Sequence, residues 1–246
     1  MPTADNLLEL ALAEAPAWFQ VGASFPNRAR GLAAVTLNAA VASFVVELEV
    51  AELDGAVRAR EHVPGTVFPV RCFERHIEAD GWFCLGLPEQ AAVSDRPSAA
   101  GWWNRLEDYL RMQRTAARTG LWPEQHALSH GAAGLHHQRA LDHAGRAGLA
   151  DAYEAFMLGD PSLLASLEPL LRRTGDRLRN GRCPCPCGRR RRDGHAVLRR
   201  NCPHREDVVG VLREERLRKE KLVQFVAAAK LSGMTCCGTM QACPLR

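Results

Sequence analysis

Apolar residues recur at helical spacing in several separate stretches of the chain. In residues 5–14 the leucines and Ala11 follow a helix-like pattern, and Asp5 is available as a cap. A second apolar stripe begins at Trp102 and stops near Gly120. A helical pattern also occurs in three later stretches, residues 135–157, 162–178 and 207–231. The pattern therefore predicts a short opening helix and a largely helical second half.

Between the first helix and Trp102 the chain favours strands. Three runs rich in strand-forming residues span 32–37, 43–50 and 66–72, and turn-forming Asp54-Gly55 and Pro64-Gly65 separate the later segments. A short last strand is expected at 82–85, followed by an irregular flap at 88–100. The sequence thus predicts an α+β fold, with an antiparallel β-meander and flanking helices.

One cysteine lies in the last of these expected strands. Cys84 follows the apolar pair Trp82-Phe83, and His76 stands eight residues upstream. A thiolate is the reactive form of cysteine, and a polar neighbour can stabilise the oxyanion formed when it attacks a carbonyl. The same spacing also suits a buried structural cysteine, because free cysteines often behave as small hydrophobic residues.

Residues 75–85 resemble the active-site segment of ubiquitin-conjugating enzymes, in which a His-Pro-Asn tripeptide precedes the thioester cysteine. Gly81 takes the family's glycine position, Cys84-Leu85 matches its Cys-Leu step, and His76 replaces its asparagine. The likeness covers residues 30–90 and includes the proline-containing approach to the site, Val63-Pro64 and Phe68-Pro69.

Three features depart from the family pattern. The His-Pro pair is absent, and the family's tryptophan a few residues after the cysteine is missing, since the nearest tryptophans are Trp102 and Trp103. Asp95 is a candidate for its acidic gate residue. In its general sequence character the chain is similar to divergent bacterial members of the family. These members are encoded together with an activating enzyme, a ubiquitin-like protein and a metal-dependent peptidase in antiviral operons.

The resemblance implies a transferase. Cys84 would accept a ubiquitin-like protein as a thioester from an activating enzyme and pass it to an amine of a protein target, with His76 stabilising the oxyanion. The same resemblance implies bacterial antiphage defence. Three alternatives stay open: a non-catalytic adaptor, a zinc-containing module that binds nucleic acid or protein, and a thiol hydrolase that uses Cys84 with a distant histidine.

Charge separates the two ends of the chain. Residues 172–246 carry 19 Lys and Arg against 7 Asp and Glu, whereas the preceding residues carry 13 against 21. A basic appendage on an acidic body indicates two units or an electrostatically chosen partner. We therefore expect a conjugating-like domain with a helical extension at 1–172, and a basic cysteine-rich module with a closing helix at 173–246.

Seven of the nine cysteines lie in the last 64 residues. Cys185, Cys187, Cys202 and His204 form a donor set that suits tetrahedral, structural zinc. These four residues resemble the small SEC-C zinc motif, although the loop between them is longer here. Two further donors, Cys183 and His195, compete for the same positions. Cys236, Cys237 and Cys243 could include a redox pair, but adjacent cysteines form strained bridges, so a flexible end is expected.

Composition also indicates where the protein is located and which partners it can bind. No apolar run approaches the length that spans a bilayer, and the first residues lack a basic start with an apolar core, so a cytoplasmic protein without a membrane partner is expected. Residues 189–192 are four consecutive arginines, but residues 181–205 contain no aromatic side chain for base stacking. Nucleic acid is therefore not expected as a partner.

Overall fold

The computed structural model describes residues 6–36, 44–123, 129–170, 179, 181, 189–195, 197–198 and 201–246. The chain forms two compact units, one built from residues 1–123 and 234–246 and the other from 124–233. Contacts between residues therefore divide the chain after Pro123. The domain boundary expected from the charge pattern, between residues 172 and 173, lies elsewhere, and the basic module that it defines stays a prediction.

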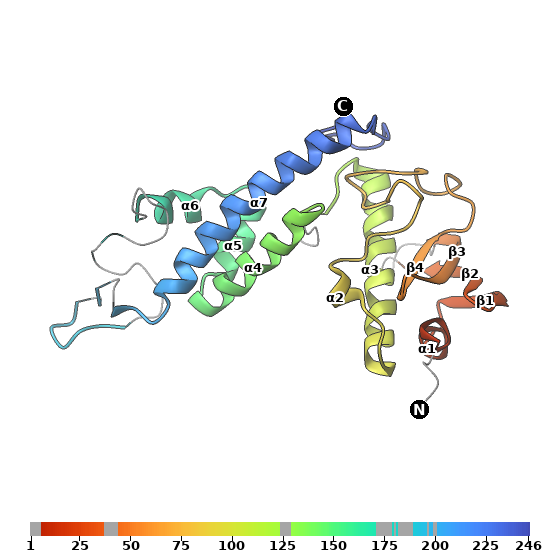
Figure 1. Ribbon diagram of the computed structural model, residues 1–246, viewed down its shortest axis with the longest axis horizontal. Coiled ribbons are helices and arrows are strands. Elements are labelled where there is room, and N and C mark those ends of the chain that lie inside the picture. The colour runs from red at the N-terminus through yellow and green to blue at the C-terminus, as the bar shows by residue number, and fades with distance from the viewer. Residues whose placement is uncertain are drawn as a thin grey trace. The chain divides into compact units, whose positions relative to one another are not determined.

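The first unit contains a four-stranded antiparallel sheet in the order β1-β2-β3-β4 (Figure 1). Its strands are β1 (Phe19–Phe25), β2 (Arg28–Val35), β3 (Phe44–Leu53) and β4 (Ala56–Glu61). Asp54 and Gly55 adopt left-handed backbone conformations between β3 and β4, which is the geometry of a tight hairpin. The expected meander and this turn are confirmed, whereas β1 and β4 were not expected as strands.

Residues 66–72 form a loop, so the strand expected there is wrong. The reason is Glu61, whose buried carboxylate accepts hydrogen bonds from the backbone N–H groups of Gly65, Val67 and Phe68. These N–H groups turn inward toward one carboxylate and are not available for a strand ladder. The loop is consequently anchored to the end of β4.

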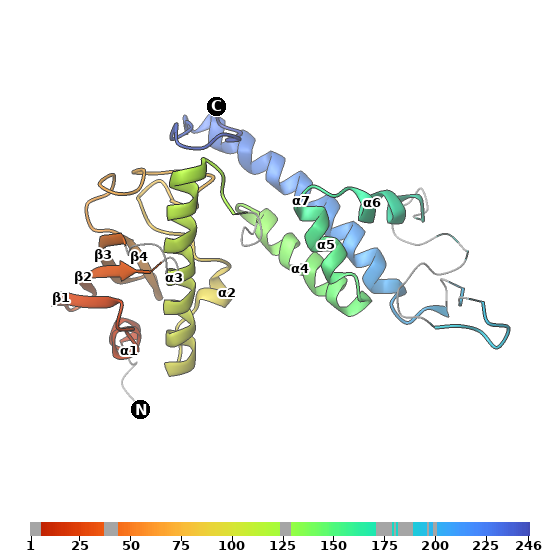
Figure 2. The ribbon, with the colours of Figure 1, turned by 180° about the vertical axis from the view of Figure 1, so that it is seen from behind.

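A long helix, α3 (Arg96–Thr119), lies along the sheet and also contacts α1 (Leu7–Ala13) (Figures 1 and 2). The indole N–H of Trp102 donates to the carbonyl of Val57 in β4 at 3.1 Å. The indole N–H of Trp103 donates to the carbonyl of Ala11 in α1 at 2.7 Å. Both indoles are buried, so adjacent residues of α3 join the helix to the sheet and to the first helix.

The ends of the helices explain several boundaries. Asn6, not Asp5, caps α1, since its side chain accepts from Leu8 and Glu9. Asp95 and Ser98 form a capping box that starts α3 before Trp102, and the expected flap contains this start as well as the short α2 (Pro88–Ala91). Gly120 ends α3 in a left-handed conformation, as expected.

The second unit is helical. It contains α4 (Ala132–Ala147), α5 (Ala150–Met157), α6 (Ser162–Leu167), the short 3-10 helix η2 (Glu168–Leu170) and α7 (Arg205–Leu231). The closing helix is confirmed, whereas the helix expected at 135–157 is interrupted by left-handed Gly148. Within the described part of the chain, no helix is both long and apolar enough to cross a membrane.

Polar contacts join α4 to α7 beside their apolar core. His136 lies 2.7 Å from Glu214, and His143 lies 2.9 Å from Asp207. A buried carboxylate, Glu215, accepts from Tyr153. His136 and His143 of α4 therefore act as packing partners of α7 acids.

Candidate functional site

Cys84 lies directly beyond the edge of the sheet. Trp82 bridges to Arg60 of the edge strand β4, and the N–H of Phe83 donates to the carbonyl of Ala59 at 2.9 Å. The strand expected at 82–85 is thus a pair of isolated bridges. These bridges fix the backbone immediately before Cys84, whose side chain is partly exposed.

His76 meets Cys84 through the backbone. His76 has a left-handed conformation with φ of 53°, and its carbonyl accepts the N–H of Cys84 at 2.9 Å. Its ring packs near Trp122, with centroids 5.2 Å apart. The fold therefore brings His76 and Cys84, the two catalytic residues expected from the sequence, into contact through their main chains.

A buried polar network holds this turn against α3. Arg75 donates through Nε to the side-chain oxygen of Gln113 at 2.7 Å and through Nη2 to the Gln113 carbonyl at 3.0 Å. In return, Gln113 Nε2 donates to the Arg75 carbonyl at 2.6 Å. Both side chains are buried, so the guanidinium and the amide satisfy each other.

Tyr109 completes the network from one turn earlier in α3. Its hydroxyl lies 3.0 Å from the carbonyl of Arg75 and 3.1 Å from that of His76, and it accepts from Gln113. Burial raises the pKa of the Tyr109 hydroxyl well above its ordinary value, so the group remains a donor. Sequence analysis placed Tyr109 and Gln113 in an apolar stripe; a glutamine within such a stripe is the signal that marks this network.

The surroundings of Cys84 favour the protonated thiol. Burial raises the pKa of Cys84, and the nearby carboxylate of Glu78 acts in the same direction. A backbone hydrogen bond with Gly86 and the guanidinium of Arg58 oppose the shift. Glu78 and Arg58 form an ion pair with each other, which limits the net charge that the sulfur experiences.

The expected zinc ligands are only partly within the described residues. Cys202 is buried and His204 stands at the N-cap of α7, two residues away. Cys185 and Cys187 lie outside the described residues, as does the rival Cys183. The other rival, His195, is exposed. Over the described ranges no three Cys, His, Asp or Glu side chains gather as a metal site, so the zinc assignment stays a prediction.

The carboxyl-terminal tail, residues 234–246, belongs to the first unit. Met240, Cys243 and Leu245 are buried, and the N–H of Gln241 donates to the carbonyl of Gly120 at 2.8 Å. The expectation of a flexible end is therefore wrong. The tail brings Cys237 against Cys72, with 2.6 Å between their sulfurs.

Comparison with protein families agrees with this architecture. Residues 24–124 match the family model described as a prokaryotic E2 domain, and residues 129–245 match one described as a cysteine-rich domain, C-terminal to the E2 domain. This succession of domains is consistent with a bacterial E2-like protein and suggests an E2-like conjugating function. The curated proteins and the solved structures gave no match to the chain.

The raised pKa of Cys84 predicts slow alkylation at neutral pH. Because folding raises this pKa, the folded state holds the thiol proton more tightly than the unfolded state does. Stability from this group is full below the unfolded pKa and is lost as pH rises through the folded pKa. We expect the rate at which iodoacetamide labels Cys84, followed by peptide mass spectrometry, to keep rising at pH values where the unfolded protein has reached its plateau.

Cys237 provides an internal control in the same digest, since the pKa of its thiol is lowered. Cys237 should reach its plateau at lower pH than Cys84. A plateau for Cys84 at or below that of Cys237 contradicts the expected direction.

Proposed function

We propose that this protein is a ubiquitin-conjugating-like transferase that carries a ubiquitin-like protein as a thioester on Cys84. The main support is the placement of a partly exposed sulfur at a sheet edge, with its backbone fixed by β4 and by the His76 carbonyl. The family match at residues 24–124 supports the same class of reaction.

The proposed reaction has two acyl transfers. The Cys84 thiolate attacks the thioester carbonyl of the ubiquitin-like protein on its activating enzyme, and the resulting oxyanion collapses to expel the activating enzyme's thiolate. An amine of the target then attacks the new thioester, expels the Cys84 thiolate and loses its proton. The products are an amide on the target and the free thiol.

In this scheme His76 donates its imidazole N–H to the oxyanion and acts without serving as the base. The support is its closeness along the backbone, because the His76 carbonyl binds the Cys84 N–H. The hydrogen bonds from Tyr109 and Gln113 support that placement. Proposed partners are thus the ubiquitin-like protein, its activating enzyme and a protein target, and the proposed setting is bacterial antiphage defence.

A structural zinc is proposed for the cysteine-rich region, with Cys185, Cys187, Cys202 and His204 as ligands. Cys202 supports this assignment, because it is a buried thiol next to His204 at the start of α7. A bound zinc would fix the segment before α7, which is too short to bury an apolar core of its own. The family description of this region as cysteine-rich is compatible with zinc.

Thioester formation tests the transferase directly. We expect the full chain, incubated with the ubiquitin-like protein and activating enzyme of the same genome and ATP, to form an adduct that thiol reductant removes. Cys84→Ala should abolish the adduct, and Cys84→Ser should give an ester that resists the reductant. Cys236→Ser, a partly exposed cysteine of the tail, is the matched control and should load normally. An adduct that survives Cys84→Ala would exclude the proposed nucleophile, and failure of the parent chain to form any thioester would favour the adaptor alternative.

His76 is tested by discharge of a preloaded Cys84 thioester to a free amine. We expect His76→Ala to slow discharge by about a hundredfold to a thousandfold, the usual cost of losing one oxyanion donor. His76→Asn should retain most of the rate, since asparagine tolerates the left-handed backbone and supplies an amide N–H. Equal rates for all three proteins would show that the side chain has no part in the reaction.

Native mass spectrometry tests zinc. We expect one zinc ion per chain under native conditions and none after denaturation in acid, which protonates the ligands. Cys202→Ser should lose the metal, whereas Cys243→Ser, another buried cysteine, should retain it. Retention of zinc by Cys202→Ser would rule out the proposed ligand set.

A further inference from the structure

Cys72 and Cys237 are brought into contact by packing within the first unit. Their sulfurs are 2.6 Å apart although the residues are 165 positions apart in the chain. Each partner is held by its own surroundings. Cys72 exchanges two backbone hydrogen bonds with Ile77, both 3.0 Å long, and the tail beyond Cys237 is fixed at Gln241 and by buried Met240.

The two sulfurs differ in access. Cys72 is 2% exposed, whereas Cys237 is partly exposed and its sulfur lies 3.1 Å from the hydroxyl of Thr239. A reagent from solvent therefore reaches Cys237 first. Cys72 is placed behind it, within reach of the same sulfur atom.

The charge distribution favours a thiolate on the accessible residue. Arg75 is buried, and within the described residues it forms no ion pair with a carboxylate. Burial opposes ionisation of Cys237, but hydrogen bonds with Cys72 and Thr239 and the positive charge of Arg75 lower the pKa of its thiol. Burial, followed by the contact with Cys237, raises the pKa of Cys72. The surroundings thus favour the thiolate on Cys237 over the thiolate on Cys72.

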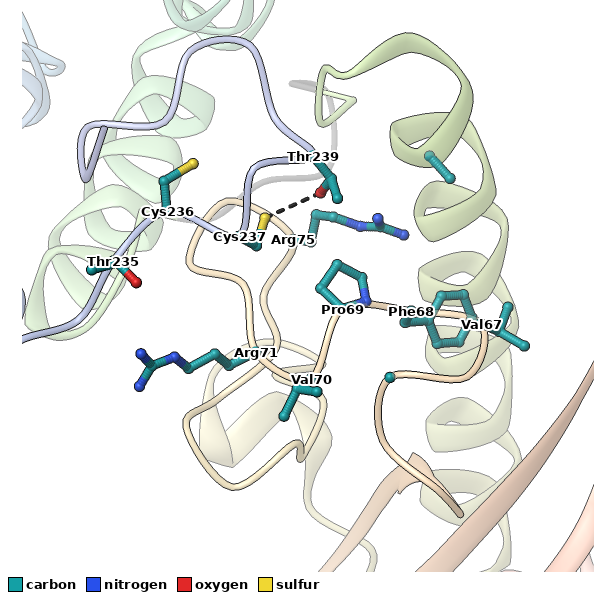
Figure 3. Close-up of a pocket in the computed structure, with 12 residues that line it drawn as sticks. Val67, Phe68, Pro69, Val70, Arg71, Arg75, Thr235, Cys236, Cys237 and Thr239 are labelled. Carbon is teal, nitrogen blue, oxygen red and sulfur yellow. Dashed lines mark hydrogen bonds between the residues drawn. The ribbon is translucent and has the colours of Figure 1, made fainter.

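Cys237 borders an open pocket of about 560 Å³. In Figure 3 the tail that carries Thr235 to Thr239 runs beside the loop that carries Val67 to Arg75, and the dashed line joins Cys237 to Thr239. Arg71 and Arg75 supply positive charge, and among the described residues that line the pocket none is acidic. The pocket therefore suits a small anionic ligand that contains both polar and apolar groups.

We propose that Cys237 and Cys72 form a thiol–disulfide exchange centre that takes a small anionic disulfide of the glutathione-disulfide class from this pocket. The Cys237 thiolate attacks one sulfur of the ligand, a mixed disulfide forms, and one glutathione leaves as its thiolate. Cys72 then loses its proton, attacks the Cys237 sulfur and expels the second glutathione. Two protein thiols and one glutathione disulfide become one protein disulfide and two glutathione molecules.

The internal disulfide would join the tail to the turn that carries His76, since Cys72 and Ile77 bracket that turn. The neighbouring Cys236 has a different partner, because its side chain is hydrogen-bonded with Cys243. Cys236 is therefore a matched control, adjacent in sequence but directed to another sulfur. The exchange does not require Cys84, so it can be tested independently of the proposed transferase activity.

The test uses the full chain in a Cys84→Ser background, reduced and then exposed to oxidised glutathione at graded ratios to reduced glutathione. Peptide mapping by mass spectrometry should find a disulfide that joins the peptides of Cys72 and Cys237, with the intact protein lighter by two hydrogen atoms. Cys72→Ser should accumulate glutathione on Cys237, and Cys237→Ser should leave Cys72 unmodified. Cys236→Ser should oxidise as the parent protein does.

The map of the parent protein decides the outcome even if Cys72→Ser fails to fold. Glutathione attached first to Cys236, a Cys236–Cys243 disulfide formed in place of the expected one, or free Cys237 at ratios that oxidise other thiols would each overturn the proposal. Zinc found on Cys72 and Cys237 by native mass spectrometry would also overturn it, because a metal-bound thiolate pair is not an exchange centre.

Discussion

The first unit depends on a buried guanidinium whose N–H groups are hydrogen-bonded to a neutral amide. Arg75 is enclosed beneath the loop, and Gln113 of α3 supplies both a side-chain and a main-chain oxygen to it. A buried cation is costly unless its donors are satisfied, so the turn at residues 72–77 has little freedom to leave α3. Tyr109 adds a second attachment through the carbonyls of Arg75 and His76.

This one anchored turn serves two sulfurs. On one side, the His76 carbonyl holds the N–H of Cys84. On the other side, Cys72 begins the turn and contacts Cys237 of the tail. The charge of Arg75, within the turn, favours the thiolate of Cys237, whereas the thiol of Cys84 experiences mainly burial. The turn therefore creates two cysteine environments with opposite shifts of pKa.

The sequence predicted those features of this unit that depend on the conformational preferences of one or two neighbouring residues. The Asp54-Gly55 turn and the stop at Gly120 follow from residues that accept left-handed backbone, and both were predicted. Strand β1 was missed although its apolar residues alternate with polar or small ones, and in the structure all of its residues after Phe19 are exposed, so this alternation does not mark a buried face. The contact of Cys72 with Cys237 has no sequence signal, since it joins positions 165 residues apart through packing alone.

The opposite pKa shifts also suit different chemistry. A thiol with a raised pKa is a poorer leaving group, so a thioester on Cys84 would be less prone to adventitious cleavage and would await an amine held close to it. A thiol with a lowered pKa, such as Cys237, leaves more easily and would hold an acyl group poorly. Its ionised form reacts readily with a disulfide at neutral pH. The environment of each sulfur therefore separates acyl transfer at Cys84 from disulfide exchange at Cys237 within a single unit.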